Sequence, residues 1–495
     1  MSVTEVATTQ TVTPQQTQPS IEKIGGTSMS DYAAVRDNIV LKPARNGELY
    51  QRVFVVSAYG GVTDKLLEHK KSGQPGIYAL FAGSVEDQSW RLALENLRDE
   101  LFIINAGLFP EPALLAEANN FIAERLDSAS KCLDDLQSLC LHGHFALEGH
   151  LATVREMLAS IGEAHSAWNT ARLLQRDGVN ARFVDLTGWQ CEEHVSLDER
   201  IQRAFEGLDL SRELPIVTGY AHSEQGLMTT FDRGYSEMTF SRVAVLTEAR
   251  EAVIHKEFHL SSADPRLVGE DNAVPIGRTN YDVADQLANL GMEAIHPRAA
   301  KGLRQQNIAL RVKNTFEPEH AGTLITGDYV SQSPCVEIIA GCKGVYAIEV
   351  FDQDMAGAIG RYDSEILAII RRFRGHVVSK DINANTITHY VATNLKTVKR
   401  IRRELEQQFA DAEIDQQKVA VVSAIGSDMK VAGMLARTVA ALAEQEVSVL
   451  AMHQSMRQVD MQFVIREEDY DRAVQALHGC LVEVHDHGEA ICLAS

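Results

Sequence analysis

Short apolar runs alternate with longer helical patterns over the first two thirds of the chain. The runs have the length of buried strands, and they occupy residues 52–58, 181–185, 214–220 and 252–255. Between the first two runs, residues 65–175 place most apolar side chains at helical spacing. Strands that alternate with helices are typical of an α/β domain with a mostly parallel sheet between helical layers. We therefore expect a three-layer domain of this class over residues 21–330.

This domain would begin with an apolar run that ends at two glycines. Residues 21–24 include Lys23, the glycines are Gly25 and Gly26, and a helical pattern follows at residues 33–40. Glycine lets the backbone approach a phosphate closely, and free N–H groups at a helix start point toward an anion. Lys23 would add a positive charge. The stretch therefore suggests a phosphate-binding turn, although an ordinary strand-to-helix turn with a surface lysine explains it equally well.

The pattern changes near residues 331–334. Two similar stretches follow, one from residue 344 and one from residue 418, and each continues through a helix, strands and a second helix. Two copies of a β-α-β-β-α-β pattern indicate a pair of ferredoxin-like modules, which we assign to residues 331–412 and 413–495. Modules of this kind commonly bind a small effector where they meet, which is an analogy of fold.

Composition narrows the class of protein. The chain has 495 residues with 47 Lys and Arg against 68 Asp and Glu, a net charge of −21. An acidic surface of this size disfavours nucleic acids and anionic membranes, and no apolar run reaches membrane-spanning length. Residues 1–20 have the composition of a disordered tail, not of a signal peptide, and the seven cysteines form no Cys-x-x-Cys pair. We expect a soluble cytoplasmic protein without nucleic-acid or membrane partners.

Two polar segments are candidates for chemistry. In residues 230–237, Arg233 offers a fork for a carboxylate or phosphate, while Ser236 and Glu237 stand where a helix would begin. A charged helix cap is the alternative. Glu163 follows a glycine that interrupts a helical run, so it would hold a substrate ammonium or simply be a solvated helix residue.

Other polar groups are weaker candidates. Residues 261–266 indicate a loop with hydroxyl groups, and His296 stands before a proline that is expected to end a helix, which makes it structural. Histidine clusters at residues 140–150 and 485–492 do not match a zinc spacing, so solvated loops are the better interpretation. The Walker-type phosphate-binding motif is absent from the sequence.

These segments, in this order, resemble the signatures of aspartokinases, which are amino-acid kinases. Residues 23–28 resemble Lys-Phe-Gly-Gly-Thr-Ser, and residues 55–63 resemble Val-Val-Ser-Ala-x-x-Gly-Val-Thr. Residues 229–237 parallel Thr-Thr-Leu-Gly-Arg-Gly-Gly-Ser-Asp, and residues 162–163 stand where the family has His-Gly-Glu. Further similar segments are residues 264–266, 290–291, 295–297 and 321–324, and residues 427–429 and 453–455 in the second of two C-terminal ACT domains. The resemblance covers residues 21–482.

The resemblance implies an aspartate kinase, which transfers the γ-phosphate of ATP to the side-chain carboxylate of L-aspartate with Mg²⁺ on the phosphates. It implies that the catalytic residues are Lys23, Gly25, Gly26 and Glu237. The substrate contacts that it implies are Ser57, Thr63, Glu163, Arg233 and Ser236. The nucleotide contacts that it implies are Thr27, Ser28, Lys256, Ser261 and Arg266, with no metal site made by the protein itself. Arg233 would bind the α-carboxylate, Glu163 would bind the ammonium, and Glu237 would orient Lys23 or the metal shell.

The sequence departs from the family pattern on the nucleotide side. Glu237 replaces an aspartate, residues 255–257 (His-Lys-Glu) replace Thr-Asp-Val, and Glu293 replaces a lysine. Our hypothesis is that Lys256 supplies the displaced positive charge. The long helical insert and residues 22–30 and 187–189 resemble the aspartokinase subgroup that is associated with ectoine biosynthesis.

Two alternatives remain open from the sequence alone. One is a non-catalytic amino-acid sensor that works through its ACT domains, and the other is a related kinase for another amino-acid carboxylate. The ACT pair implies an amino-acid effector and a homodimer or higher homo-oligomer. Gln458 and Asp460 replace the usual Glu and Asn near the effector loop, so the sequence leaves the identity of the effector open.

Overall fold

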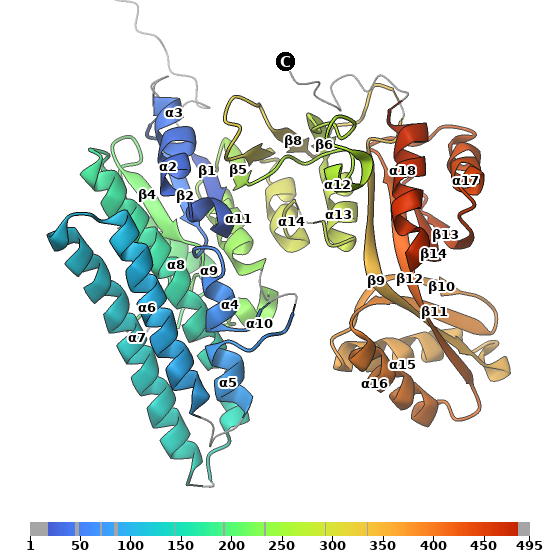
Figure 1. The fold of residues 1–495 in the computed structure, drawn as a ribbon, viewed down its shortest axis with the longest axis horizontal. Coiled ribbons are helices and arrows are strands. Elements are labelled where there is room, and N and C mark those ends of the chain that lie inside the picture. Colours follow the sequence, from blue (N-terminus) through green and yellow to red (C-terminus); the bar gives the residue numbers. More distant parts are fainter. Residues whose placement is uncertain are drawn as a thin grey trace, which may run out of the picture. The chain divides into compact units, whose positions relative to one another are not determined.

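The chain divides into two compact units in the computed structural model (Figure 1). The structure describes residues 18–44, 49–69, 72–83, 88–142, 144–191, 194–231, 234–292, 294–333 and 335–483. The first unit comprises the residues up to His259 together with His296–Thr326. The second unit comprises Leu260–Ile295 together with the residues from Gly327 onward.

The strands that belong to the first unit lie in one sheet, in the order β3-β4-β2-β1-β5-β7-β8. These strands are β1 (Ser20–Ile24), β2 (Arg52–Val56), β3 (Ala181–Val184), β4 (Leu214–Thr218), β5 (Glu251–Lys256), β7 (Leu310–Asn314) and β8 (Thr323–Thr326). Neighbouring strands are parallel from β3 to β7, whereas β8 is antiparallel to β7. Every residue of β1, β2 and β4 is buried, as expected for strands covered on both faces. The predicted α/β class with a mostly parallel sheet is confirmed.

Helices connect these strands and cover the sheet. They are α1 (Gly26–Met29), α2 (Tyr32–Ala34), the π-helix η2 (Val35–Val40), α3 (Leu41–Ala44), α4 (Val62–Leu66), α5 (Ile77–Gly83), α6 (Ser89–Leu108), α7 (Pro112–Cys140), η3 (Leu147–Gly149), α8 (Leu151–Arg176), α9 (Leu197–Phe205), α10 (Leu227–Phe231), α11 (Tyr235–Leu246) and α14 (Pro297–Gln305). The long helices α6, α7 and α8 lie side by side (Figure 1). Helix α8 packs on β2, β3 and β4, and α11 packs on β1, β2 and β5. Within the described part of the chain, no helix has the length and apolar character needed to cross a membrane.

Two local expectations in the first unit were wrong. Helix α8 is continuous through Gly162, where a helical break was expected. A Cβ at Gly162 would lie 2.9 Å from the Cβ of Ala58, so the glycine allows close packing instead of breaking the helix. Pro297 begins α14 with His296 as its N-cap, where a helix end was expected. Proline is well tolerated at the first helical position, because no intrahelical hydrogen bond is lost there.

The second unit contains a six-stranded antiparallel sheet of order β10-β11-β9-β12-β14-β13. Its strands are β9 (Ile338–Phe351), β10 (His376–Ile382), β11 (Thr386–Ala392), β12 (Glu413–Ile425), β13 (Val449–Gln454) and β14 (Asp460–Arg466). Its other elements are α12 (Pro265–Val268), β6 (Arg278–Asn280), α13 (Tyr281–Asn289), η5 (Gln353–Met355), α15 (Ile359–Arg372), α16 (Leu395–Gln408), α17 (Met434–Glu444), η6 (Glu467–Asp469) and α18 (Tyr470–Leu481). Both expected ferredoxin-like modules are therefore present.

The two modules share strands β9 and β12, which differs from the linear division at residue 412. The first module uses residues 345–351 of β9 and pairs them with residues 413–419 of β12. The second module starts at residues 421–425 of β12, and residues 338–342 of β9 lie beside them as its fourth strand. One module is thus inserted into the other. The sequence repeat could not show this, because a fourth strand taken from upstream lies outside the repeat.

The segment 260–295 also departs from the expected boundary at residue 330. It packs within the second unit, where Val283 and Leu287 share a core with Phe463. Ser262 Oγ and His478 Nε2 are 2.9 Å apart in the same unit. Burial of these apolar side chains in the shared core explains why residues 260–295 belong to the same unit as the ferredoxin-like modules.

Candidate active site

Lys23 and Glu237 form the charged centre of the first unit. Lys23 lies on β1 and Glu237 lies in the first turn of α11, and Lys23 Nζ is 3.3 Å from Glu237 Oε1. Glu237 Oε2 accepts a hydrogen bond of 2.5 Å from the backbone N–H of His296. Burial alone would raise the pKa of Glu237, but the positive charges of Lys23 and Lys256 and these hydrogen bonds lower it. The carboxylate therefore stays charged and holds the Lys23 ammonium in place.

The turn after β1 is tightly fixed. A Cβ at Gly26 would lie 2.7 Å from the carbonyl oxygen of Ala58, so only glycine fits there without displacing the backbone. The Gly25 N–H donates to the carbonyl of His255 at 3.2 Å. We had expected the Gly25 N–H to bind a phosphate. Because this hydrogen bond occupies the Gly25 N–H, Gly25 instead shapes the turn.

Glu163 lies on α8 and is only 1% exposed. Its Oε1 accepts a hydrogen bond of 2.7 Å from Ser236 Oγ, whereas its Oε2 has no partner at hydrogen-bond geometry among the described residues. Burial raises the pKa of Glu163 to about 8, although Ser236, the charge of Lys23 and the nearby Tyr220 amide favour the charged form. Ser236 and Glu237 are consecutive, so the first turn of α11 joins Glu163 to Lys23.

The other hydroxyl residues expected at the site differ in orientation. Ser57 follows β2 and Thr63 lies in α4, and both are partly exposed. Thr27 is exposed on α1. Ser28 is fully buried, and its Oγ is 2.9 Å from Thr315 Oγ1. The Ser28 hydroxyl is therefore buried and hydrogen-bonded inside the protein, which argues against the expected contact with the nucleotide.

Lys256 ends strand β5 beside the turn after β1. Strands β1 and β5 pair with Ile24 opposite His255, so Lys256 follows at the level of Gly25. The Lys256 side chain is partly exposed, and its carbonyl accepts a hydrogen bond of 2.8 Å from the Thr315 N–H. The lysine therefore stands at the same edge of the sheet as Lys23.

A buried ion network supports the sheet next to the site, and sequence reasoning missed it. Glu22 accepts bonds of 2.6 and 3.0 Å from the Arg52 guanidinium. His255 Nε2 is 2.7 Å from Glu22 Oε2. The sequence signal was present, because charged residues stand inside apolar strand runs at Glu22, Arg52 and His255, and buried charges require partners.

The roles expected for all of the site residues stay predictions, including those of residues that lie elsewhere. Ser261 and Arg266 lie in the second unit, where Arg266 forms an exposed ion pair with Asp264. Arg233, Glu293 and the histidine cluster at 485–492 lie outside the described residues. Among the residues that the structure does describe, no group of three or more His, Cys, Asp or Glu side chains is arranged to hold a metal ion.

Comparisons with known proteins agree with this arrangement. Residues 20–314 match the model of the amino acid kinase family, and residues 422–481 match an ACT domain. A protein of Stutzerimonas stutzeri (strain A1501) named "Aspartate kinase Ask_Ect" is 58% identical over 475 residues, which cover 96% of this chain and 100% of that protein. The chain belongs to the amino acid kinase family, among the aspartate kinases. The predicted family is therefore confirmed.

More distant aspartate kinases share the sequence or the fold. "Aspartokinase 1, chloroplastic" of Arabidopsis thaliana is 25% identical over 72% of this chain and 66% of its own length. The crystal structure of E. coli aspartokinase III in complex with aspartate and ADP has a TM-score of 0.70 at 19% identity, and it covers 94% of this chain and all of that chain. The Clostridium acetobutylicum aspartate kinase has a TM-score of 0.65 at 18% identity over 93% of this chain and 100% of that chain. These structures show the same fold.

Proposed function

We propose that this aspartate kinase transfers the γ-phosphate of ATP to the side-chain carboxylate of L-aspartate and releases 4-phospho-L-aspartate and ADP. The observation that carries the proposal is that two consecutive residues hold two groups of different chemistry. Ser236 contacts Glu163 and Glu237 contacts Lys23, so a carboxyl group and an ammonium are held by the same helical turn. One suits the ammonium of an amino acid, and the other suits a phosphate.

The reaction needs positioning more than proton transfer. A carboxylate with a pKa of about 4 is already ionised at neutral pH, so no general base is required. One of its oxygens forms a bond to the γ-phosphorus while the bond from that phosphorus to the bridging oxygen of ADP breaks, and ADP keeps the electron pair. Lys23 neutralises charge on the transferred group, and Glu237 holds Lys23 in place.

Glu163 would bind the substrate ammonium through its unoccupied oxygen. With a pKa of about 8, this carboxyl is largely protonated in the free enzyme at neutral pH, and the incoming ammonium would favour the charged form. Ser57 and Thr63 would line the pocket, and Arg233 would bind the α-carboxylate. Specificity would then depend on recognising both charges of an amino acid.

Mg²⁺ fits this site as an ion carried by the nucleotide. Mg²⁺ usually keeps several waters and is held by phosphate oxygens with one or two carboxylates, so it requires no dedicated protein cage. When bound, it would neutralise charge on the β- and γ-phosphates. Glu237 is the acidic side chain beside Lys23, and it would orient either that lysine or the shell of the metal.

The deciding experiment measures ADP release from Mg-ATP with L-aspartate, while hydroxylamine traps the acyl phosphate. We expect aspartate-dependent ADP and an equal yield of aspartyl hydroxamate. Equal turnover with L-glutamate would indicate a kinase for another carboxylate. Folded protein that binds aspartate without turnover would support the sensor instead.

We further propose that the ferredoxin-like pair binds an amino-acid effector and joins subunits into a homodimer or larger assembly. The pair shares two strands, so a ligand between its modules would act on a single sheet. A related E. coli enzyme, aspartokinase III, has been crystallised with lysine and aspartate, and its structure has a TM-score of 0.70 at 20% identity, covering 94% of this chain and 99% of that chain. Calorimetry with lysine, threonine and methionine tests the effector. If none of the three binds, the modules would serve only to join subunits. Sedimentation measures the oligomeric state separately.

A further inference from the structure

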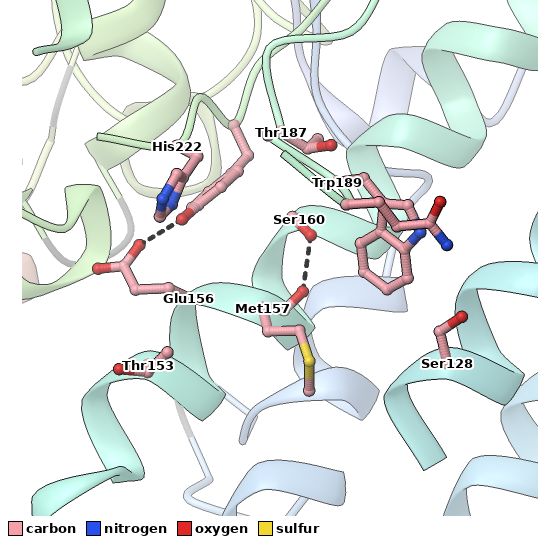
Figure 2. A pocket seen from close by; sticks show the side chains of 11 residues that line it. Ser128, Thr153, Glu156, Met157, Ser160, Thr187, Trp189 and His222 are labelled. Atoms are coloured by element: carbon pink, nitrogen blue, oxygen red, sulfur yellow. Dashed lines mark hydrogen bonds between the residues drawn. The ribbon is translucent and has the colours of Figure 1, made fainter. Parts of the chain in front are cut away.

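The first unit contains a cavity that the proposed reaction does not use. It has a volume of about 270 Å³ and lies between α7, α8 and the loops after β3 and β4 (Figure 2). Its lining includes Thr153, Glu156, Met157, Trp189, Tyr220 and His222. Glu156 lies seven residues before Glu163 on the same helix, which separates them by about 10 Å along its axis. The volume is just below the range of about 300–1,000 Å³ that is typical for drug-sized ligands, so an amino-acid-sized molecule would fit.

Glu156 gives the cavity its charge. Its Oε2 accepts a hydrogen bond of 2.7 Å from the Tyr220 hydroxyl, which Figure 2 shows as a dashed line. Its Oε1 accepts hydrogen bonds of 2.9 Å from the Thr229 N–H and 3.3 Å from the Thr229 hydroxyl. All three donors are neutral, so the bonds orient the carboxylate without cancelling its charge. Burial and the charge of Arg200 lower the pKa of His222, which therefore adds no positive charge at neutral pH.

The rest of the lining is largely apolar. The Trp189 ring and the Met157 side chain lie along the cavity (Figure 2). The site thus combines an acidic end with an apolar and aromatic wall.

The wall that carries Trp189 is rigidly built. Gly188 has a φ of 66°, and a Cβ there would lie 2.8 Å from the Cβ of His222, so glycine is required. The Arg125 guanidinium stacks on the Trp189 ring at 5.1 Å and donates to Thr187 Oγ1 at 3.2 Å. A wall fixed in this way loses little conformational entropy when a ligand binds.

We propose that this cavity binds a small amphipathic amine, with its ammonium at Glu156 and its apolar body against Met157 and Trp189. A buried carboxylate attracts an organic cation, and an aromatic ring packs against an apolar body. The site goes beyond the proposed function, because binding here requires neither Lys23 nor a nucleotide.

Calorimetry with phenethylamine tests the site, using full-length protein. We expect saturable binding to the wild type, and no comparable binding of the neutral 2-phenylethanol or the anionic 3-phenylpropionate. Glu156→Gln keeps a hydrogen-bond acceptor but removes the charge, and it should weaken binding at least about tenfold. Thr153→Trp, which fills the exposed side of the cavity, should abolish binding. Glu148→Gln is the matched control, because it removes an exposed charge that does not line the cavity.

The outcomes separate this site from the candidate active site. Lys23→Ala should bind phenethylamine as the wild type does, even though it should lose turnover. If Lys23→Ala loses amine binding while folded, the probe occupies the active site and the proposal is wrong. Equal binding of 2-phenylethanol, or equal weakening by Glu148→Gln, would also overturn it. Absence of kinase activity with amine binding intact would reject only the proposed function.

Discussion

Glu22 and Glu163 both carry buried carboxyl groups in the first unit, and their surroundings shift the pKa values of these groups in opposite directions. Burial alone would raise the pKa of Glu22, but the charge of Arg52 and the bonds from His255 and Arg52 hold it far below its usual range. Both oxygens of Glu22 are occupied. Glu163 has one occupied oxygen, and its pKa rises to about 8.

The two carboxyl groups differ in whether both of their oxygens have a hydrogen-bond partner among the described residues. Successive residues of a strand point to opposite faces, so Glu22 and its neighbour Lys23 enter different surroundings. Glu22 joins a complete network that fixes the strands. Lys23, Glu237 and Glu163 form an incomplete network, in which a substrate would supply the missing partner.

Lys23→Ala should produce the largest change. We expect turnover to fall by about 10²–10³-fold or more, because a positive charge at the transferred phosphoryl group is lost. The folded structure should persist by circular dichroism. Lys65→Ala, which removes an exposed lysine paired with Glu100, is the control and should keep its turnover. Retained turnover in Lys23→Ala would reject the assignment of the site.

Arg52→Ala tests the complete network. Removing one partner of a buried ion pair leaves the other charge unpaired, so the free energy of unfolding should drop by about 3–5 kcal/mol. The carbonyls of Ile39 and Val40 would lose a donor as well. Arg36→Ala, which breaks an ion pair near the surface, should cost less than about 1 kcal/mol. Urea denaturation of both variants makes the comparison, and similar losses would contradict it.

Glu163→Gln tests the incomplete network. We expect the KM for aspartate to rise about 10–100-fold, because a charged hydrogen bond to the ammonium is lost. In the wild type, the apparent KM should fall between pH 6.5 and 8.5 as Glu163 loses its proton, since its pKa is about 8. The variant should show no such pH dependence, and an unchanged profile would reject this role.

The same carboxyl predicts a dependence of stability on pH. A pKa raised in the folded state favours folding at low pH, and this contribution disappears as the pH rises from the unfolded value toward about 8. Denaturation from pH 5 to pH 8 should therefore show the wild type losing stability relative to Glu163→Gln.

Lys256→Ala should have a smaller effect. The apparent KM for ATP should rise up to about tenfold, because the lysine stands beside the turn after β1 and adds one charge to Lys23. Lys301→Ala on α14 removes an exposed lysine and serves as the control. An unchanged KM for ATP would dispose of the idea that Lys256 supplies the displaced charge.

Ser28→Ala should have the smallest effect. Loss of the hydrogen bond to Thr315 should lower the free energy of unfolding by about 1 kcal/mol and leave the KM for ATP unchanged. Thr27→Ala, at the exposed neighbour, is the matched variant for nucleotide affinity. A specific rise of KM in Ser28→Ala would return this residue to the nucleotide site.

The sequence alone identified the class of fold and the family, and it predicted the segments of the candidate site. Apolar runs located the central strands of the first unit, and the ordered motifs around Lys23, Glu163 and Glu237 indicated an aspartate kinase. Local pattern sufficed because each strand is buried as a whole and each motif follows a strand or begins a helix. The π-helix, the continuous α8 and the start of α14 were missed, because packing and capping decided them.

Tertiary structure decided which side chains meet. The Ser28 hydroxyl contacts Thr315 in the interior, and the Gly25 N–H donates a hydrogen bond to His255. The first part of β9 pairs with the second module, which begins more than seventy residues later in the sequence. The cavity at Glu156 and Trp189 brings together residues from separate elements that no motif joins. Sequence patterns report burial along one element at a time, whereas pairing between elements depends on long-range packing that the local pattern does not contain.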